Sequence, residues 1–227
     1  MFTQDKRIRI ITGFYGSGKS EFALNYAIGL SKLDKKVALA DLDVVNTYFR
    51  SREQRQILAD HGVKLISSSL REDNTDLPAL SAQIVGPLQD KSWQYVMDMG
   101  GNDVGLLPLA WLGPYLPQEA MDIFMVVNIN RTETATVESI LHKVEEIERG
   151  CGYKITGFVH NTNLIRESSA EDLLQGQEIL LRATSLSGIP IVYTAYWDEV
   201  MGIGNLPASS IAGQLVPMKL YLRKDWM

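Results

Sequence analysis

Cysteine and histidine are scarce in this 227-residue sequence, which has one cysteine, Cys151, and three histidines. A lone cysteine cannot form a disulfide within the chain, and no Cys-x-x-Cys pair or Cys/His cluster has the spacing of a metal site. These absences exclude a disulfide framework and a zinc-dependent fold. They fit a reducing compartment, so we expect a cytoplasmic protein.

Excess positive charge and long hydrophobic runs are missing as well. The chain has 22 lysines and arginines against 27 aspartates and glutamates, for a formal net charge of −5. That balance lacks the basic footprint on which nucleic-acid binding depends. No apolar run approaches the length of a membrane span, and the polar N-terminus does not resemble a signal peptide. We expect no nucleic-acid partner and no membrane association.

Short runs rich in β-branched residues alternate with helical patterns along most of the chain. This order is typical of strand-helix-strand units and a largely parallel sheet. Hydrophobic residues make up 45% of the chain, enough for one substantial core. We predict a single α/β domain over residues 1–227, with a mostly parallel sheet and helices on both faces. The expected strands are 8–12, 36–41, 63–67, 95–98, 123–128, 155–161 and 189–194.

Two helices can be predicted in more detail. The first carries an apolar stripe from Val137 to Ile147 and is expected to end at Gly150. The second is expected to begin at Ser168, three residues before Glu171, which is the spacing of a capping box. Its predicted core residues are Leu173, Leu174, Leu180 and Leu181.

Two further segments have patterns of their own. Glycine and proline are frequent in 100–117, which predicts a loop. Within it, Trp111 and Tyr115 are expected to pack against the domain as a lid, with a partner-binding patch as the alternative. Near the C-terminus, apolar residues from Val216 to Leu222 alternate with mostly polar ones, which favours a final strand over a membrane-surface helix.

The segment from Gly13 to Ser20 has the most specific pattern in the chain. It reads Gly-Phe-Tyr-Gly-Ser-Gly-Lys-Ser, which matches a P-loop, and it lies between an expected strand and an expected helix. Such a loop turns its N–H groups towards a phosphate at the positive end of the helix. Lys19 would reach the β- and γ-phosphates and Ser20 would bind Mg²⁺; the alternative is a glycine-rich turn without a ligand. The predicted nucleotide-binding residues here are Gly13, Tyr15, Gly16, Ser17, Gly18, Lys19, Ser20 and Glu21.

Aspartates follow or end two of the expected strands. Asp98 ends a hydrophobic strand and precedes two glycines, which is typical of a Walker B segment at a Mg²⁺ site. Asp41 and Asp43 point the same way if strand geometry continues, so both carboxylates would lie near the metal. In each case the alternative is a solvated aspartate at a strand end, and spacing alone does not decide for the pair.

The P-loop, the Asp-x-Asp of 41–43 and the Asp-x-x-Gly that starts at Asp98 together resemble the MinD/ParA branch of the SIMIBI class of P-loop NTPases, which also contains the nitrogenase iron protein. The resemblance covers about the first half of the chain by motif. It implies ATP and Mg²⁺ as cofactors. It also implies that Asp41 positions or activates the attacking water, with Lys19 as the second catalytic residue. Ser20, Asp43 and Asp98 would then act at the metal.

One position departs from that branch. MinD/ParA loops usually carry a second lysine directly after the first glycine, which reaches the nucleotide of a partner subunit, and here that position is Phe14. Activation by this lysine across a homodimer is therefore not implied, although a homodimer stays possible. Arg50, Arg52 or Arg131 is a candidate replacement charge, with a solvated surface arginine as the alternative.

The base is predicted from the end of the sixth expected strand. The sequence there has Asn161 without the Asn-Lys-x-Asp motif typical of guanine-specific P-loop proteins, which favours adenine. In the resembled branch an asparagine at this strand end contacts the adenine edge, so Asn161 is the predicted base contact, against a turn-forming asparagine. The neighbouring His160 is assigned no role.

These patterns predict an ATP-binding protein, a slow Mg²⁺-dependent ATPase whose nucleotide state moves the 100–117 segment and so controls a protein partner. A small-molecule kinase or ATP-dependent ligase is the alternative on the same scaffold, with Asp41 or Asp43 acting on an acceptor. A GTP-binding metallochaperone is a third reading, disfavoured by the missing Cys/His metal spacing and by the missing guanine motif.

Overall fold

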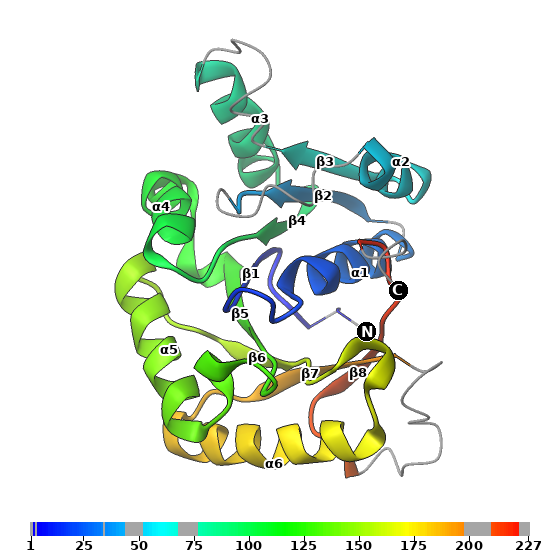
Figure 1. The fold of residues 1–227 in the computed structure, drawn as a ribbon. Coiled ribbons are helices and arrows are strands. Elements are labelled where there is room, and N and C mark those ends of the chain that lie inside the picture. Colours follow the sequence, from blue (N-terminus) through cyan, green and yellow to red (C-terminus); the bar gives the residue numbers. More distant parts are fainter. Residues whose placement is uncertain are drawn as a thin grey trace.

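The computed structural model describes residue 2 and residues 4–33, 35–43, 52–67, 77–197 and 210–222. In these ranges eight strands form one sheet in the order β3-β2-β4-β1-β5-β6-β7-β8, and every neighbouring pair is parallel (Figure 1). The strands are β1 (Ile8–Thr12), β2 (Lys36–Asp41), β3 (Val63–Ser67), β4 (Trp93–Asp98), β5 (Met121–Val127), β6 (Gly157–His160), β7 (Ile191–Tyr196) and β8 (Gln214–Pro217). The predicted α/β class and parallel sheet are confirmed.

Helices cover both faces of this sheet. The helices are α1 (Lys19–Ser31), α2 (Arg52–Asp60), α3 (Leu77–Gln89), α4 (Asp103–Leu112), α5 (Val137–Cys151) and α6 (Ala170–Ser187). Figure 1 shows α1 and α2 on one side of the sheet and α4 and α5 on the other. β1 is buried on both faces of the sheet. Ile8 and Ile10 join the core under α3 to α6, and Ile11 joins the core under α1 and α2.

The predicted ends of the two helices were wrong by one or two residues. α5 continues through Gly150 to Cys151, and Gly152, with a φ of 74°, is the residue that ends it. α6 is capped by Ser169 rather than Ser168, because Ser169 and Asp172 make the reciprocal hydrogen bonds of a capping box. Leu181 is 43% exposed, so its assignment to the core was also wrong.

The prediction of a loop over 100–117 was wrong. Residues 103–112 form α4, and a 3-10 turn, η2 (Gly113–Tyr115), follows directly. Asn102 caps α4 by accepting a hydrogen bond from the N–H of Gly105. This cap stabilises the first turn of a helix that Gly105 and Pro108 would otherwise weaken. Trp111 is 49% exposed and Tyr115 is 41% exposed, so they do not form a packed lid.

The C-terminal segment combines a short strand with an extended tail. β8 ends at Pro217, earlier than the predicted alternation suggested, and the chain then continues to Leu222 along α1 (Figure 1). Met218 is buried, and its N–H donates to the carbonyl oxygen of Tyr196 at 2.8 Å.

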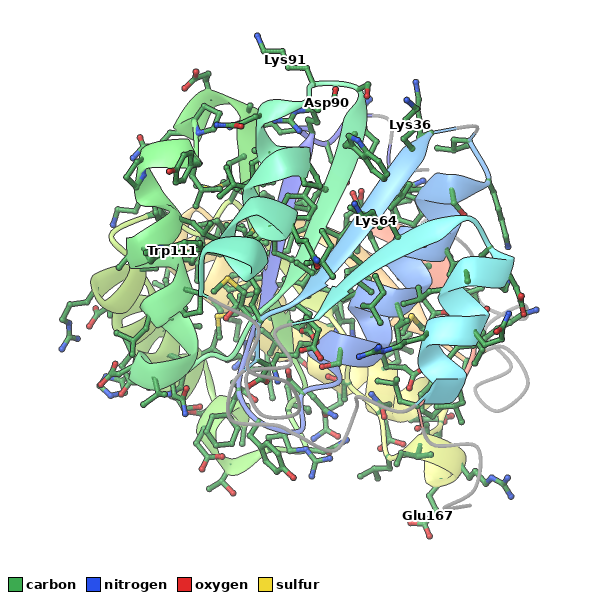
Figure 2. The ribbon with its side chains drawn as sticks, turned by 90° about the horizontal axis from the view of Figure 1, so that it is seen from above. Lys36, Lys64, Asp90, Lys91, Trp111 and Glu167 are labelled. Carbon is green, nitrogen blue, oxygen red and sulfur yellow. The ribbon has the colours of Figure 1, made fainter. Side chains whose placement is uncertain are left out.

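Figure 2 shows the two ends of the strands. Lys36, Asp90 and Lys91 lie where β2 and β4 begin, and Glu167 lies at the opposite end.

Candidate nucleotide-binding site

The P-loop lies at the carboxyl end of β1, which pairs with β4 on one side and β5 on the other. Gly16 and Gly18 have φ values of 76° and 88°, in the region that glycine alone enters without strain. α1 starts at Lys19, directly after Gly18, and a glycine has no side chain to cap the first N–H groups of the helix. Those N–H groups therefore face the loop as donors for an anion.

Lys19 forms a buried ion pair with Asp43, which follows the end of β2. Their Nζ and Oδ2 atoms lie 2.8 Å apart, and both side chains are only 5% exposed. The predicted proximity of Asp43 to the P-loop is therefore present. The carboxylate of Asp43 fills the position of an anion for Lys19, which is the part that a phosphate oxygen plays in a loaded P-loop.

Asp98 ends β4 directly opposite Asp41 of β2 and Ile11 of β1. Burial raises the pKa of the Asp98 carboxyl to about 7; the nearby charges of Asp41 and Asp43 act in the same direction, and Lys19 and a hydrogen bond with Ser20 oppose it. Asp98 therefore stands next to Ser20, as predicted for two groups at one metal. Asp41 lies half-buried at the same edge.

Two buried oxygens suit this region to a bound cation and nucleotide. Asp98 Oδ1 and Ser17 Oγ have no hydrogen-bond partner among the described residues. A buried unpaired polar atom is costly, so each is fitted to a ligand that supplies the missing contact. No three His, Cys, Asp or Glu side chains in the described ranges come together as a metal cluster. A P-loop Mg²⁺ needs none, because phosphate oxygens and waters supply most of its ligands.

The chain after Asp98 packs on the P-loop itself. The Thr12 hydroxyl donates to the carbonyl oxygen of Gly100 at 3.1 Å. A Cβ on Gly101 would lie 2.4 Å from the carbonyl oxygen of Gly13, and a Cβ on Gly105 would lie 2.6 Å from the Cα of Gly100. Glycines that permit close approach were expected here from the sequence, but two residues were missed: Asn102, which caps α4, and Gly105, which lies in its first turn.

Two side chains from other strands hold the P-loop backbone. Asn161, which follows β6, is buried and donates from Nδ2 to the carbonyl oxygen of Ser17 at 2.7 Å. Arg131, which follows β5, donates from Nε to the carbonyl oxygen of Gly16 at 2.9 Å. Of the three candidate arginines, Arg131 lies at the P-loop; Arg50 lies outside the described residues, as does the side chain of Arg52.

Two hollows meet at the P-loop, and Tyr15, which is 65% exposed, lines both. The first lies between the loop and the Walker B segment, and its walls include Lys19, Asp43 and Gly101. The second lies on the far side of the loop. It is lined there by Gly16, Gly18, Lys19, Ser20, Glu21, Arg131, Asn161, Asn163, Ile165, Trp197, Met218, Leu220 and Leu222. Lys19 also lines both hollows, whereas Ser20 lines the second alone.

Glu21 lines the second hollow, but its carboxylate is engaged. Its two oxygens accept hydrogen bonds from the backbone N–H groups of Tyr221 and Leu222, at 2.6 and 3.1 Å. The observed role of Glu21 is thus to hold the C-terminal segment beside the P-loop. Sequence reasoning missed this segment as part of the site, although its alternating pattern was visible.

His160 ends β6 and lies in the interior of the fold. It is fully buried, its Nε2 lies 2.9 Å from the carbonyl oxygen of Leu173, and burial lowers its pKa to about 4.

Within the described ranges, none of the helices combines the length and apolarity needed to cross a membrane.

A parallel sheet with a P-loop sequence at the end of its central strand defines the fold of a P-loop nucleoside triphosphatase. Solved structures of FtsY share this fold. FtsY from Mycoplasma mycoides matches with a TM-score of 0.54 at 15% identity, over 85% of this chain and 61% of that chain. Cell division protein FtsY from Thermotoga maritima gives 0.53 at 18% identity, over 83% and 60%. Chloroplast FtsY from Physcomitrella patens gives 0.54 at 14% identity, over 86% and 59%.

The chain spans about three fifths of the length of these FtsY chains, so the likeness concerns the shared fold. No protein-family model and no curated protein matches this sequence.

Proposed function

We propose that this chain binds Mg²⁺-ATP at the P-loop and hydrolyses it slowly, as a nucleotide-dependent switch for a protein partner in the cytoplasm. The observation that carries the proposal is the buried group formed by Lys19, Asp43 and Asp98. In this group the Lys19 ammonium is paired with Asp43, and Asp98 Oδ1 has no hydrogen-bond partner among the described residues. Such an arrangement is costly in a site without a ligand and is compensated by a phosphate and a divalent cation.

The roles follow from the positions of the side chains. When the phosphates occupy the loop, Lys19 is expected to leave Asp43 for the β- and γ-phosphates. Asp43, Asp98 and Ser20 would then hold Mg²⁺ and its waters. Bound Mg²⁺ supplies charge neutralisation for the transferred phosphoryl group. Asp41, across from Asp98 in the sheet, is the proposed residue that orients the attacking water.

Adenine is the proposed base. The β6 end carries Asn161 without a following Lys-x-Asp, and one N–H of its amide is used on the P-loop backbone. The remaining amide N–H and oxygen of Asn161 are proposed to meet the edge of a base in the second hollow, which Asn163 also lines. Competition between ATP and GTP tests this choice directly.

The switch proposal rests on α4. Gly101 touches the P-loop and Gly105 touches Gly100, so α4 is connected to the phosphate side by backbone contacts. Val104, Leu107 and Trp111 lie three and four residues apart on α4 and are exposed, so they form one apolar stripe. Trp111 is labelled in Figure 2. A partner that binds this stripe would sense any shift of α4 that a γ-phosphate causes.

We also propose that this chain belongs to the MinD/ParA branch and that it forms a homodimer. Both proposals rest on the Asp-x-Asp and Asp-x-x-Gly segments, which the fold brings to one edge of the sheet. Because Phe14 replaces the signature lysine, hydrolysis would not use a lysine from a second subunit. Arg131, with its Nε on Gly16, is the proposed positive charge at the loop.

Phosphate release under saturating ATP and Mg²⁺ tests the proposed chemistry. The parent protein should release phosphate slowly, and Asp41→Asn should reduce the rate roughly a hundred-fold because an orienting group is lost, while ATP binding survives. Equal rates for the two proteins would refute the role of Asp41. Release only after a small-molecule acceptor is added would favour the kinase alternative.

A further inference from the structure

Residues 218–222, here called the C-terminal strap, are fastened to α1 by two side chains. Asn25 donates from Nδ2 to the carbonyl oxygen of Lys219 at 2.9 Å, and the N–H of Lys219 donates to Asn25 Oδ1 at 2.8 Å. One turn earlier on α1, Glu21 accepts from the N–H groups of Tyr221 and Leu222. Figure 1 shows this segment running beside α1. Side chains of α1 thus satisfy the backbone hydrogen-bonding groups of the strap, as a neighbouring strand would in a sheet.

The apolar residues of the strap form a wall of the second hollow. Met218, Leu220 and Leu222 lie two residues apart and all line it, together with Trp197 and Ile165. The lining of the same hollow includes Asn161 and Arg131, whose amide and guanidinium groups hold the P-loop backbone. A hollow with an apolar wall and a few polar groups in its lining has the chemistry that receives a purine base.

The first turn of α1 joins the strap to the phosphates. Lys19 and Ser20 are the residues proposed to contact the phosphates and Mg²⁺, and Glu21, the next residue, is buried with both carboxylate oxygens on the strap. A buried carboxylate is retained at low cost only while its hydrogen bonds are made. The strap is therefore held in one position relative to the loop that binds the phosphates.

We propose that the C-terminal strap is the wall against which the nucleobase packs, and that its attachment to Asn25 and Glu21 sets the affinity for the base. This inference rests on the proposed nucleotide site and adds to it the residues that recognise the purine. A strap that only completes the hydrophobic core would contribute equally to the binding of any ligand of the P-loop.

Calorimetric titration with Mg²⁺-ATP and with inorganic tripolyphosphate separates these roles, because tripolyphosphate carries the phosphates without the base. Asn25→Ala removes two hydrogen bonds of the strap and leaves the lining of the hollow intact, and Leu222→Ala shortens the wall itself. Each should weaken Mg²⁺-ATP binding roughly five- to ten-fold and change tripolyphosphate binding less than about two-fold. Gln214→Ala, an exposed change on β8, is the matched control and should alter neither affinity.

Equal loss of both ligands, or no loss of either, would overturn the inference while leaving the P-loop site in place. If the parent protein binds neither ligand, the proposed nucleotide site itself is wrong and the wall with it. Trypsin cleavage after Lys219 gives a readout that needs no variant: ATP should slow it by several-fold more than tripolyphosphate does. Equal protection by the two would contradict a base-binding strap.

Discussion

Lys19 and Asp43 form an ion pair in the interior of the site, with 2.8 Å between Nζ and Oδ2 and both side chains 5% exposed. The two residues come from different elements, since Lys19 starts α1 and Asp43 follows β2. The attraction between the two charges offsets the cost of removing each from water, which neither could bear if it were buried alone. The pair therefore couples the stability of the free protein to the groups proposed to bind the phosphates and the metal.

Removing one member of this pair should destabilise the nucleotide-free protein. Lys19→Met removes the ion-pair partner of the buried Asp43 carboxylate, which is expected to lower the free energy of unfolding by about 3–5 kcal/mol. The double change Lys19→Met with Asp43→Leu removes both charges and should recover most of that loss. Urea unfolding of the parent, the two single variants and the double variant measures the coupling. Additive losses in the double variant would mean that the pair does not form in solution.

The pKa of Asp98, raised to about 7 by burial, predicts a pH dependence of stability in Mg²⁺-free buffer. Between about pH 4 and pH 7 the unfolded chain has lost the proton of Asp98 while the folded protein keeps it. The folded state therefore binds more protons, and stability should fall as pH rises, by about 1 kcal/mol per pH unit. Asp98→Asn should flatten this slope. Urea unfolding between pH 5 and pH 7 measures how the free energy of unfolding changes with pH. The same pH dependence in the parent and in Asp98→Asn would refute the burial of a protonated Asp98.

Gly101 tests the contact between the Walker B segment and the P-loop. A Cβ at this position would lie 2.4 Å from the carbonyl oxygen of Gly13, so Gly101→Ala must displace backbone. We expect it to lower the midpoint of thermal unfolding and to weaken Mg²⁺-ATP binding by roughly ten-fold or more. Gly86→Ala in α3 is the control: outside its chain neighbours its Cβ would meet nothing within 4 Å, so it should leave Mg²⁺-ATP binding unchanged, with at most a local cost from the following Pro87. Similar behaviour of the two variants would argue against the contact.

Base choice is predicted from Asn161. ATP should bind more tightly than GTP by roughly ten-fold or more. Asn161→Ala should narrow that ratio, because the remaining amide groups are proposed to meet the adenine edge. Asn130→Ala removes an exposed amide near the same loop and should leave the ratio unchanged. Competition with a fluorescent nucleotide measures all three proteins, and a preference for GTP in the parent would reverse the assignment.

The sequence was most informative where a local pattern determines a local structure. β-branched runs located the strands, and the glycines of 13–18 located the loop, because both reflect short-range backbone preferences. The strand order β3-β2-β4-β1 could not be read in this way, since it depends on pairing between segments far apart in the chain. α4 was mistaken for a loop because Gly105 and Pro108 look like helix breakers. Gly105 is there for a close contact with Gly100, which sequence does not reveal.

Side chains that join distant segments were also beyond sequence reasoning. Glu21 was predicted among the nucleotide-binding residues, and its carboxylate accepts hydrogen bonds from the N–H groups of residues 221 and 222, about two hundred positions later. Arg131 was one of three equal candidates until its Nε was found on the carbonyl oxygen of Gly16. In both cases the type of residue was suggestive, and only the folded chain identifies its partner.

Calorimetric titration of the parent protein and of Lys19→Ala with Mg²⁺-ATP tests the central claim most directly. The P-loop account predicts a saturable heat of binding for the parent with one nucleotide per chain. It predicts that Lys19→Ala loses affinity by roughly a hundred-fold or more, because the phosphates lose a charge-assisted partner in a buried site. Binding by Lys19→Ala at the affinity of the parent, or no binding by a folded parent protein, would contradict it.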